Sequence, residues 1–270
     1  MGINRPLPTR ILTADIGGSH ITVGVCDLQT HTICEQSAIR VEVNSKGSAN
    51  DILNAWGGAF EQVLKKDEQL QILGLGIAMP GPFDYENGIS YIKGLNKYEA
   101  LYGLDIRQYL AALLKLDPQL VRFRNDAEST IAGEVLMGAG KGYQRVLGIT
   151  LGTGFGSAYS GNGITLDINL GSEPYQQTIA DDYFSTRWFV ARFQELTGIS
   201  LTGGVKELAA LAPASAVARR IFKEFAADMG DFLSEPIKQL TPEALIICGN
   251  IAKASRFFLP DLVRDRKSVV

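Results

Sequence analysis

Two short glycine-rich segments, one in each half of the chain, contain the residue types that bind phosphate groups. Residues 11–20 read ILTADIGGSH and residues 146–155 read VLGITLGTGF, so that Gly17 aligns with Gly152. Glycine permits positive φ and lets an anion approach the backbone, whose N–H groups can bind its oxygens. A plain hairpin turn is the alternative for either segment alone. Two such turns at matching positions predict that both hold one phosphate chain, through Gly17, Gly18, Ser19, Gly152, Thr153 and Gly154.

Asp15 stands at the end of the first of these strands, two residues before the glycine pair. A carboxylate does not bind phosphate directly, but it can hold Mg²⁺ through water, and nucleotide phosphates carry Mg²⁺. Neither segment is a P-loop or a dinucleotide fingerprint, because no helix follows at once and no Gly-Lys-Ser/Thr occurs. We therefore expect a nucleotide with Mg²⁺ held by a pair of strand–turn–strand units.

Asn125 and Asp126 follow a short apolar strand and open a helix. The carboxyl ends of strands in α/β sheets face the ligand crevice. Phosphoryl transfer to a sugar hydroxyl needs one carboxylate within hydrogen-bond reach of the attacking O–H group. We interpret Asp126 as that general base and Asn125 as a residue that orients the sugar. Helix capping by Asp126 is the alternative, and it is compatible with the catalytic role.

Four other positions have a functional and a structural interpretation. Gly81, in Pro80-Gly81-Pro82, either brings backbone close to a ligand or only ends a strand. Gly249 follows an apolar strand and either lets a flat base lie against backbone or opens a helix. Glu173 and Asp181, in a polar stretch after the second glycine turn, either bind hydroxyls or are exposed loop acids.

These residues require two lobes to position them. In the first lobe, apolar patterning and turn residues predict strands 10–15, 21–27, 32–43, 72–79 and 120–123, with helices 51–66 and 106–114. A helix over 127–137 follows, and the pattern restarts at Arg145, which places a break near residues 136–144. In the second lobe we expect strands 146–151, 156–159 and 244–247, a long helix over 215–240 and a final helix after Asn250.

Composition limits the function classes. The chain has 270 residues, 46% hydrophobic and 20% charged, with a net charge of −3 and interspersed acids and bases, so nucleic-acid binding is not expected. The odd count of three cysteines has no ligand spacing and predicts reduced thiols in a cytoplasmic protein. The sequence contains no long apolar segment, so no membrane partner is expected.

Taken together, the segments 14–27, 74–88, 125–140, 148–161 and 244–254 resemble the ROK family of sugar kinases and repressors, within the actin/hexokinase/Hsp70 ATPase superfamily. The resemblance implies an α/β fold of two ribonuclease-H-like domains with an interdomain cleft, divided as 1–124 and 125–270. It also implies ATP and Mg²⁺ as cofactors, a hexose as substrate and a homodimer as the assembly.

The same resemblance assigns roles to individual residues. Asp126 matches the family's catalytic base, Asn125 and Gly81 its sugar-proximal positions, and Gly249 its adenosine-side turn. Asp15, Gly17, Gly18 and Ser19 match the first phosphate turn, and Gly152, Thr153 and Gly154 match the second.

Three departures from the family pattern stand out. The family's histidine element and cysteine-rich zinc loop are missing around residues 171–176, which predicts no zinc and makes Glu173 and Asp181 candidate replacements for two sugar-binding glutamates. Residues 94–98 read GLNKY where relatives carry Asn-Leu and a tryptophan. The chain also stops soon after Gly249, where relatives continue through a further strand and a helix that returns to the first domain.

We therefore expect an ATP-dependent kinase for glucose or an N-acetylhexosamine. The alternative is a non-catalytic or weakly active sugar sensor of the same family. A DNA-binding repressor is disfavoured, because only about ten residues precede the first strand.

Overall fold

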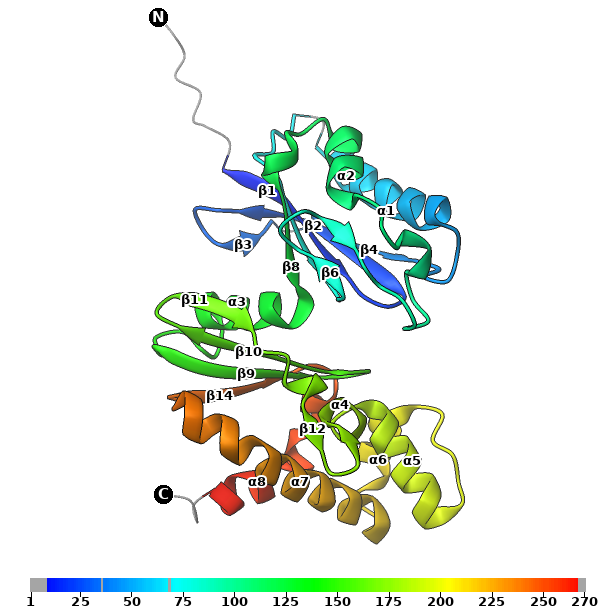
Figure 1. Cartoon of the computed structure of the whole chain (residues 1–270), viewed down its shortest axis with the longest axis vertical. Helices are drawn as coiled ribbons and strands as arrows, with labels where there is room; N and C mark the ends of the chain where they lie inside the picture. Colours follow the sequence, from blue (N-terminus) through cyan, green and yellow to red (C-terminus); the bar gives the residue numbers. More distant parts are fainter. Residues whose placement is uncertain (1–8, 35, 68, 267–270) are drawn as a thin grey trace, which may run out of the picture. The chain divides into compact units, whose positions relative to one another are not determined.

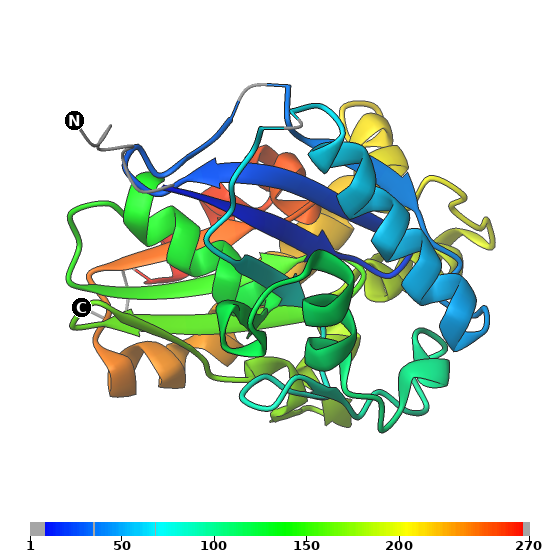
Figure 2. The same cartoon turned by 90° about the horizontal axis from the view of Figure 1, so that it is seen from above.

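The computed structural model describes residues 9–34, 36–67 and 69–266 (Figures 1 and 2). The chain divides into two compact units between Asp126 and Ala127. Each unit combines a mixed β-sheet with helices, as the α/β prediction requires. The two units, called unit 1 and unit 2 below, are described separately.

Unit 1 is built on a sheet of order β3-β2-β1-β5-β8, with β4 pairing β2. Strands β1 and β2 form an antiparallel hairpin, whereas β1, β5 and β8 run parallel. Their bounds are β1 Arg10–Ile16, β2 His20–Asp27, β3 Thr32–Ile33, β4 Ile39–Glu42, β5 Leu75–Met79 and β8 Val121–Asn125. The small pair β6 Phe83–Asp84 and β7 Ile89–Ser90 lies outside this sheet.

The single strand expected over residues 32–43 is wrong, because the chain forms two short strands there, both paired to β2. Ser37 accounts for the break. Its hydroxyl donates to Cys34 O (2.7 Å) and accepts from Val25 N (3.0 Å), so a side chain replaces the backbone ladder at this point.

Two helices share one core with this sheet. α1, Ala49–Leu64, begins with a capping box between Ser48 and Asp51 and packs against β2 and β4 (Figure 2). α2, Ile106–Leu114, has the bounds predicted from the sequence, and Asp105 caps it by accepting from Gln108 N (2.9 Å). Short 3₁₀ turns, η1 Glu99–Leu101 and η2 Pro118–Leu120, complete the unit.

Unit 2 is built on a sheet of order β11-β10-β9-β14. The strands are β9 Arg145–Leu151, β10 Phe155–Gly161, β11 Ile164–Asp167 and β14 Ala244–Cys248. Helix α3, Asp126–Met137, covers one face of this sheet (Figure 1). Its Ile131 packs with Val146, Ala158 and Ile246. The break expected near residues 136–144 is therefore wrong, since α3 is held to the unit 2 sheet by these apolar contacts.

The opposite face of the unit 2 sheet carries the long helix α7, Ala216–Leu240, together with α8, Leu259–Arg266 (Figure 1). The smaller helices are α4 Ala180–Tyr183, α5 Thr186–Thr197, α6 Gly204–Leu211 and the 3₁₀ turns η3 Leu170–Ser172 and η4 Ile251–Phe257. The core between them is aromatic, with Phe184, Phe189, Phe222, Phe225 and Phe258 fully buried.

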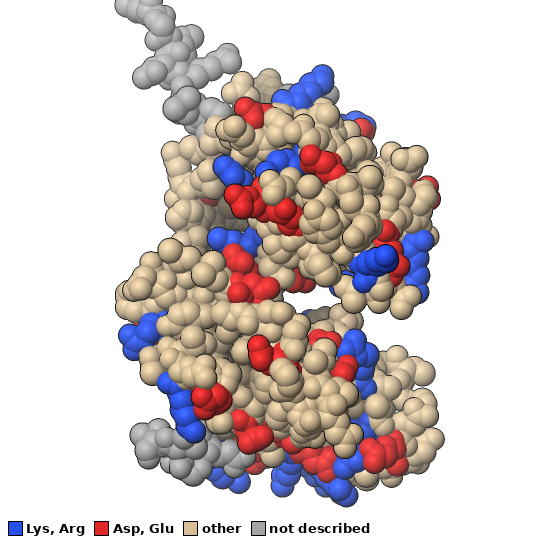
Figure 3. Space-filling view, in the orientation of Figure 1, with Lys and Arg blue, Asp and Glu red and all other residues tan. Residues whose placement is uncertain are grey.

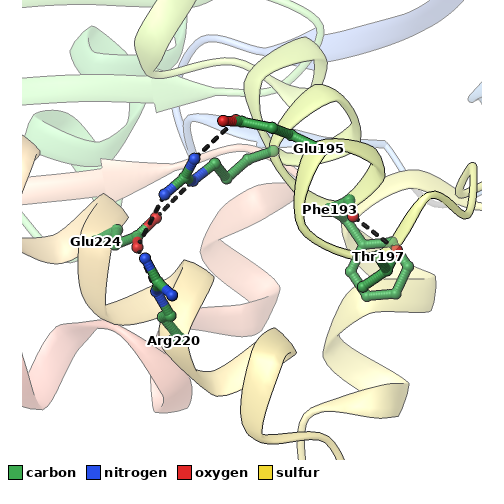
Figure 4. A network of polar contacts seen from close by, with 6 residues as sticks. Phe193, Glu195, Thr197, Arg220 and Glu224 are labelled. Atoms are coloured by element: carbon green, nitrogen blue, oxygen red, sulfur yellow. Dashed lines mark hydrogen bonds and ion pairs between the residues drawn. The ribbon is translucent and has the colours of Figure 1, made fainter.

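An ion-pair network joins α5 to α7 (Figure 4). Arg192 donates to both oxygens of Glu224 (2.8 and 3.2 Å), and Arg220 donates to the same carboxylate (2.7 Å). Glu195 accepts from the remaining arm of Arg192 (2.7 Å). The hydrogen bond from Arg192 is the main reason that the pKa of Glu224 lies below its ordinary value.

Charges of both signs lie on one face of each unit. On the face shown in Figure 3, acidic and basic side chains are interspersed over both units. Within the described ranges, the structure has no helix long and apolar enough to cross a membrane.

Candidate active site

The carboxyl ends of three parallel strands bring the predicted unit 1 residues to one edge of the sheet. Asp15 of β1 pairs with Ala78 of β5, and Met79 of β5 pairs with Asn125 of β8. The glycine turn after β1, the proline-rich turn after β5 and Asp126 after β8 therefore leave the sheet together. This edge is where α/β sheets place their ligands.

Hydroxyl groups from distant residues hold the first glycine turn. Tyr98 Oη donates to Gly17 O (2.6 Å), and Ser45 Oγ donates to Gly18 O (2.6 Å). Burial raises the pKa of Tyr98 to about 12, so its hydroxyl stays protonated and remains a donor. Gly17 N–H donates to His20 O (2.9 Å) and closes the turn.

The remaining donors of this turn have no protein partner. The N–H groups of Gly18 and Ser19 donate to none of the residues that the structure describes. The Ser19 hydroxyl lies 2.8 Å from His20 Nδ1. The Gly17 and Gly18 carbonyls accept hydrogen bonds from protein hydroxyls, whereas the Gly18 and Ser19 N–H groups have no acceptor among the described residues. The turn therefore offers the donors that an anion requires.

The two glycines of this turn do not use positive φ, so that part of the sequence interpretation is wrong. A Cβ on Gly18 would meet only Lys97 Cδ, at 4.0 Å, and one on Gly17 would meet only His20 O, at 3.7 Å. Neither backbone conformation nor packing within the chain therefore demands glycine at these positions. The open space beside the turn fits the close approach of a ligand.

The Asp15 carboxyl is exposed to solvent, yet enough protein surrounds it for burial to raise its pKa. Repulsion from Asp126 raises this pKa further, whereas Arg40 lowers it. The two carboxylates therefore lie within electrostatic range of each other at the same strand edge. A divalent cation, whose preferred ligands are oxygens, would relieve this repulsion.

Tyr85 connects the proline-rich turn to Asn125. Its hydroxyl donates to Met79 O (3.1 Å) and accepts from Asn125 Nδ2 (3.3 Å). A Cβ on Gly81 would lie 3.2 Å from the same hydroxyl. Gly81, Asn125 and Tyr85 therefore form one polar group beside Asp126, and no sequence motif marks Tyr85 as part of it.

The second glycine turn, in unit 2, is held in the same manner as the first. Gly152 O accepts from both the backbone N and the Oγ1 of Thr186 (2.8 Å each), and Gly152 N donates to Gly154 O (3.0 Å). The N–H groups of Thr153 and Gly154 donate to no residue in the described part of the chain. A Cβ on Gly152 would meet nothing within 4 Å.

A cavity of about 440 Å³ in unit 2 adjoins this turn through Thr186. It is lined by Thr186, Gly203, Gly204, Val205, Asn250 and Ile251, among others. Its apolar and backbone surface suits a flat heterocyclic base, and Lys206 and Lys253 add basic groups to the wall. Because Thr186 belongs both to the cavity wall and to the glycine turn, a bound nucleotide could occupy both.

Gly249 precedes this cavity wall and serves the fold. Its φ is +90°, and a Cβ there would lie 2.3 Å from Leu151 O. The absence of a side chain is therefore needed for the close approach of the chain to the end of β9. The residues that follow Gly249, rather than Gly249 itself, line the cavity.

The two predicted sugar-binding acids differ in their surroundings. Asp181 accepts from Phe155 N through one oxygen and from Arg187 through the other, so both oxygens hold the chain around the second glycine turn. Glu173 is exposed, and its carboxylate contacts none of the described residues. Glu173 is thus the one of the two with a carboxylate available to a ligand.

The hairpin of β12 Pro174–Tyr175 and β13 Thr178–Ile179 follows Glu173, in the region where the family resemblance predicts that a zinc loop is missing. Tyr175 holds the hairpin by donating to Asp228 O (3.0 Å) and by packing against Tyr183, Phe184 and Phe232. Among residues 9–34, 36–67 and 69–266, no three His, Cys, Asp or Glu side chains gather as metal ligands. The lack of a zinc site stays a prediction.

Comparison with known proteins settles the family. Residues 11–171 match the model of the ROK family. The chain belongs to the ROK family. It is 26% identical over 157 residues to the glucokinase of Thermotoga maritima, covering 58% of this chain and 46% of that protein. It is 30% identical over 159 residues to the N-acetylgalactosamine kinase AgaK of a Shewanella species, covering 58% and 45%. The matched chain spans about half the length of these curated relatives.

Solved structures of other ROK proteins share the fold. The ROK hexokinase of Thermus thermophilus aligns with a TM-score of 0.78 at 20% identity, over 96% of this chain and 89% of that one. A ROK glucokinase of Streptomyces griseus, solved with glucose and AMPPNP, aligns with 0.75 at 22% identity over the same shares. A ROK transcriptional regulator, a homologue of the E. coli MLC protein, aligns with a TM-score of 0.80 at 16% identity, over 97% of this chain and 70% of that one. These alignments confirm the predicted two-domain α/β fold.

Proposed function

We propose that this chain is an ATP-dependent sugar kinase that phosphorylates a hydroxyl of glucose or of an N-acetylhexosamine. The observation that carries the proposal is the common strand edge in unit 1, where unpartnered N–H groups of the first glycine turn lie near the Asp15 and Asp126 carboxylates. The names of the matched relatives, glucokinase and N-acetylgalactosamine kinase, support the reaction class and the sugar class.

In the proposed reaction Asp126 is the general base. It accepts the proton of the sugar hydroxyl while that oxygen bonds to the γ-phosphorus, and the bond from the γ-phosphorus to the β–γ bridging oxygen breaks to release ADP. Asn125, Gly81 and Glu173 would position the sugar. We omit Asp181 from the sugar-binding set because its two oxygens already accept hydrogen bonds from the protein.

Each glycine turn would bind phosphate oxygens, through Gly17, Gly18 and Ser19 in unit 1 and through Gly152, Thr153 and Gly154 in unit 2. Backbone donors that are fixed in advance stabilise negative charge as it develops in the transition state. The cavity beside Thr186 would hold the adenosine. Asp15 would hold Mg²⁺ through water, and the ion when bound would neutralise charge on the phosphates.

The test measures ADP release with Mg-ATP and a panel of glucose, mannose, fructose, allose, N-acetylglucosamine, N-acetylgalactosamine and N-acetylmannosamine. We expect sugar-dependent release that Asp126→Asn lowers by roughly 10²- to 10⁴-fold, the range typical of a general base. Glu86→Gln is the matched control, because it also removes one exposed unit 1 carboxylate and should leave turnover unchanged.

Strong residual turnover in Asp126→Asn would exclude Asp126 as the base. No release with any sugar, while Mg-ATP still binds, would favour the alternative of a non-catalytic sugar sensor. The likeness to a ROK transcriptional regulator keeps that alternative in view, since the fold is common to kinases and regulators.

A further inference from the structure

The segment around Lys97 is fastened to the first glycine turn. Tyr98 donates through Oη to Gly17 O (2.6 Å) and through its backbone N to Ser45 O (2.6 Å), and Ser45 in turn holds Gly18 O. The Tyr98 ring is fully buried against Trp56, with ring centroids 5.5 Å apart. These contacts fix the backbone on the C-terminal side of Lys97 relative to the turn.

Lys97 is flanked by two residues with unusual backbone. Asn96 and Tyr98 both have φ of 54°, a region that non-glycine residues seldom adopt. Asn96 is held by its N–H, which donates to Glu99 Oε1 (2.9 Å). Strained backbone that the surroundings hold in place is common at ligand sites. Here it directs the segment so that the Lys97 side chain lies beside the turn.

The Lys97 side chain is half-buried, and its Cδ lies 4.0 Å from the place where a Gly18 Cβ would stand. Its ammonium group forms no ion pair or hydrogen bond with any residue in the described part of the chain. Arg40 is a basic residue that lowers the pKa of Asp15. A lysine without an acidic partner, beside two unpartnered N–H groups, completes the donor set of an anion site.

We propose that Lys97 binds the terminal phosphoryl group of the bound nucleoside triphosphate, as a substrate-binding residue of unit 1. This inference rests on the proposed kinase function only where it assigns Lys97 to the γ-phosphate rather than to the α-phosphate. The transferred phosphoryl group must lie near the general base, and Asp126 is within electrostatic range of Asp15, two residues before the turn. The turn beside Lys97 therefore receives the γ-phosphate rather than the α-phosphate.

The test compares binding of Mg-AMPPNP and Mg-ADP by isothermal titration calorimetry, with no sugar and no turnover. The substitution Lys97→Met keeps the aliphatic stem and removes the charge. We expect it to weaken Mg-AMPPNP binding by about ten-fold or more, as for a lost charge-assisted hydrogen bond, and Mg-ADP binding by less than about three-fold. Lys97→Arg should restore most of the AMPPNP affinity.

Lys93→Met is the matched control, since Lys93 belongs to the same segment but lies over the Tyr102 ring, 5.6 Å from its centroid. It should change neither affinity. Retained ADP binding shows that each variant is folded. Equal losses for AMPPNP and ADP in Lys97→Met, or no loss for either, would overturn the inference. A chain that binds AMPPNP in this pattern but phosphorylates no sugar would overturn the kinase proposal and leave the role of Lys97 standing.

Discussion

Replacing Gly152 by alanine tests whether this glycine is needed for ligand binding rather than for folding. Gly152 has no positive φ, and a Cβ would meet no atom within 4 Å. Alanine at a compatible backbone conformation stabilises a protein by about 0.4–1 kcal/mol, because the unfolded chain has fewer conformations to lose. We therefore expect Gly152→Ala to be as stable as the parent chain or slightly more stable.

The same substitution should impair nucleotide binding. A methyl group beside the turn would occupy space from which a phosphate reaches the Thr153 and Gly154 N–H groups. Loss of one or two hydrogen bonds to a charged group is worth about 1.5–3 kcal/mol each, so Mg-AMPPNP affinity should fall at least about ten-fold. Urea unfolding followed by circular dichroism measures the stability, and calorimetric titration measures the affinity.

Gly249→Ala is the matched control in the same unit. There φ is +90° and a Cβ would lie 2.3 Å from Leu151 O, a backbone atom that cannot move aside cheaply. The left-handed conformation alone costs about 1–2 kcal/mol for alanine, and the overlap brings the expected loss to about 3 kcal/mol or more. Two results would refute the reasoning for Gly152: a loss of stability above about 1 kcal/mol, or an unchanged AMPPNP affinity.

Three further outcomes are expected. Tyr98→Phe removes the donor to Gly17 O and should lower the free energy of unfolding, measured in urea, by about 1–2 kcal/mol. It should also weaken AMPPNP binding. An unchanged unfolding free energy together with an unchanged affinity would exclude the anchoring role of Tyr98. Glu224→Gln should cost about 1–2 kcal/mol at pH 7, since Arg192 and Arg220 both donate to this carboxylate. The pKa of Glu224 is lowered in the folded chain, so its carboxylate stabilises the fold fully above the unfolded pKa of about 4.3. This stabilisation is lost as the pH falls through the folded pKa. The unfolding free energies of the parent chain and of Glu224→Gln should therefore converge in acid. Asp15→Asn should be slightly more stable than the parent at pH 7, by less than about 1 kcal/mol for so exposed a group, because the raised pKa of Asp15 means that the fold disfavours its charged form. That advantage should vanish below about pH 4, where Asp15 is protonated in both states, and a variant less stable than the parent at pH 7 would contradict the assignment.

Features that depend on neighbouring residues were predictable from the sequence. The helix over 106–114 has its predicted bounds, because its apolar spacing and the Asp105 cap are local signals. The two strand–turn–strand segments were recognised for the same reason, since apolar strands ending in small residues form a local pattern. The placement of Asp15, Asn125 and Asp126 at the ends of strands was predictable in the same way, whereas their roles toward a ligand stay predictions.

The groups that hold those turns were decided only by the tertiary structure. Tyr98 reaches Gly17 across 81 positions of sequence, and Thr186 reaches Gly152 across 34, so no local pattern marks either hydroxyl as an anchor. The split of the expected strand over 32–43 depends on Ser37 contacting a different strand. The surroundings of Gly249 and Asp181 were also not predictable from the sequence, since the Leu151 carbonyl 2.3 Å from a Gly249 Cβ and the two donors to the Asp181 carboxylate come from other segments. The sequence by itself determined which residues could do chemistry and where the chain turns, because these are set by residue type and short-range periodicity. What holds those residues in place was decided by contacts between segments that only folding brings together.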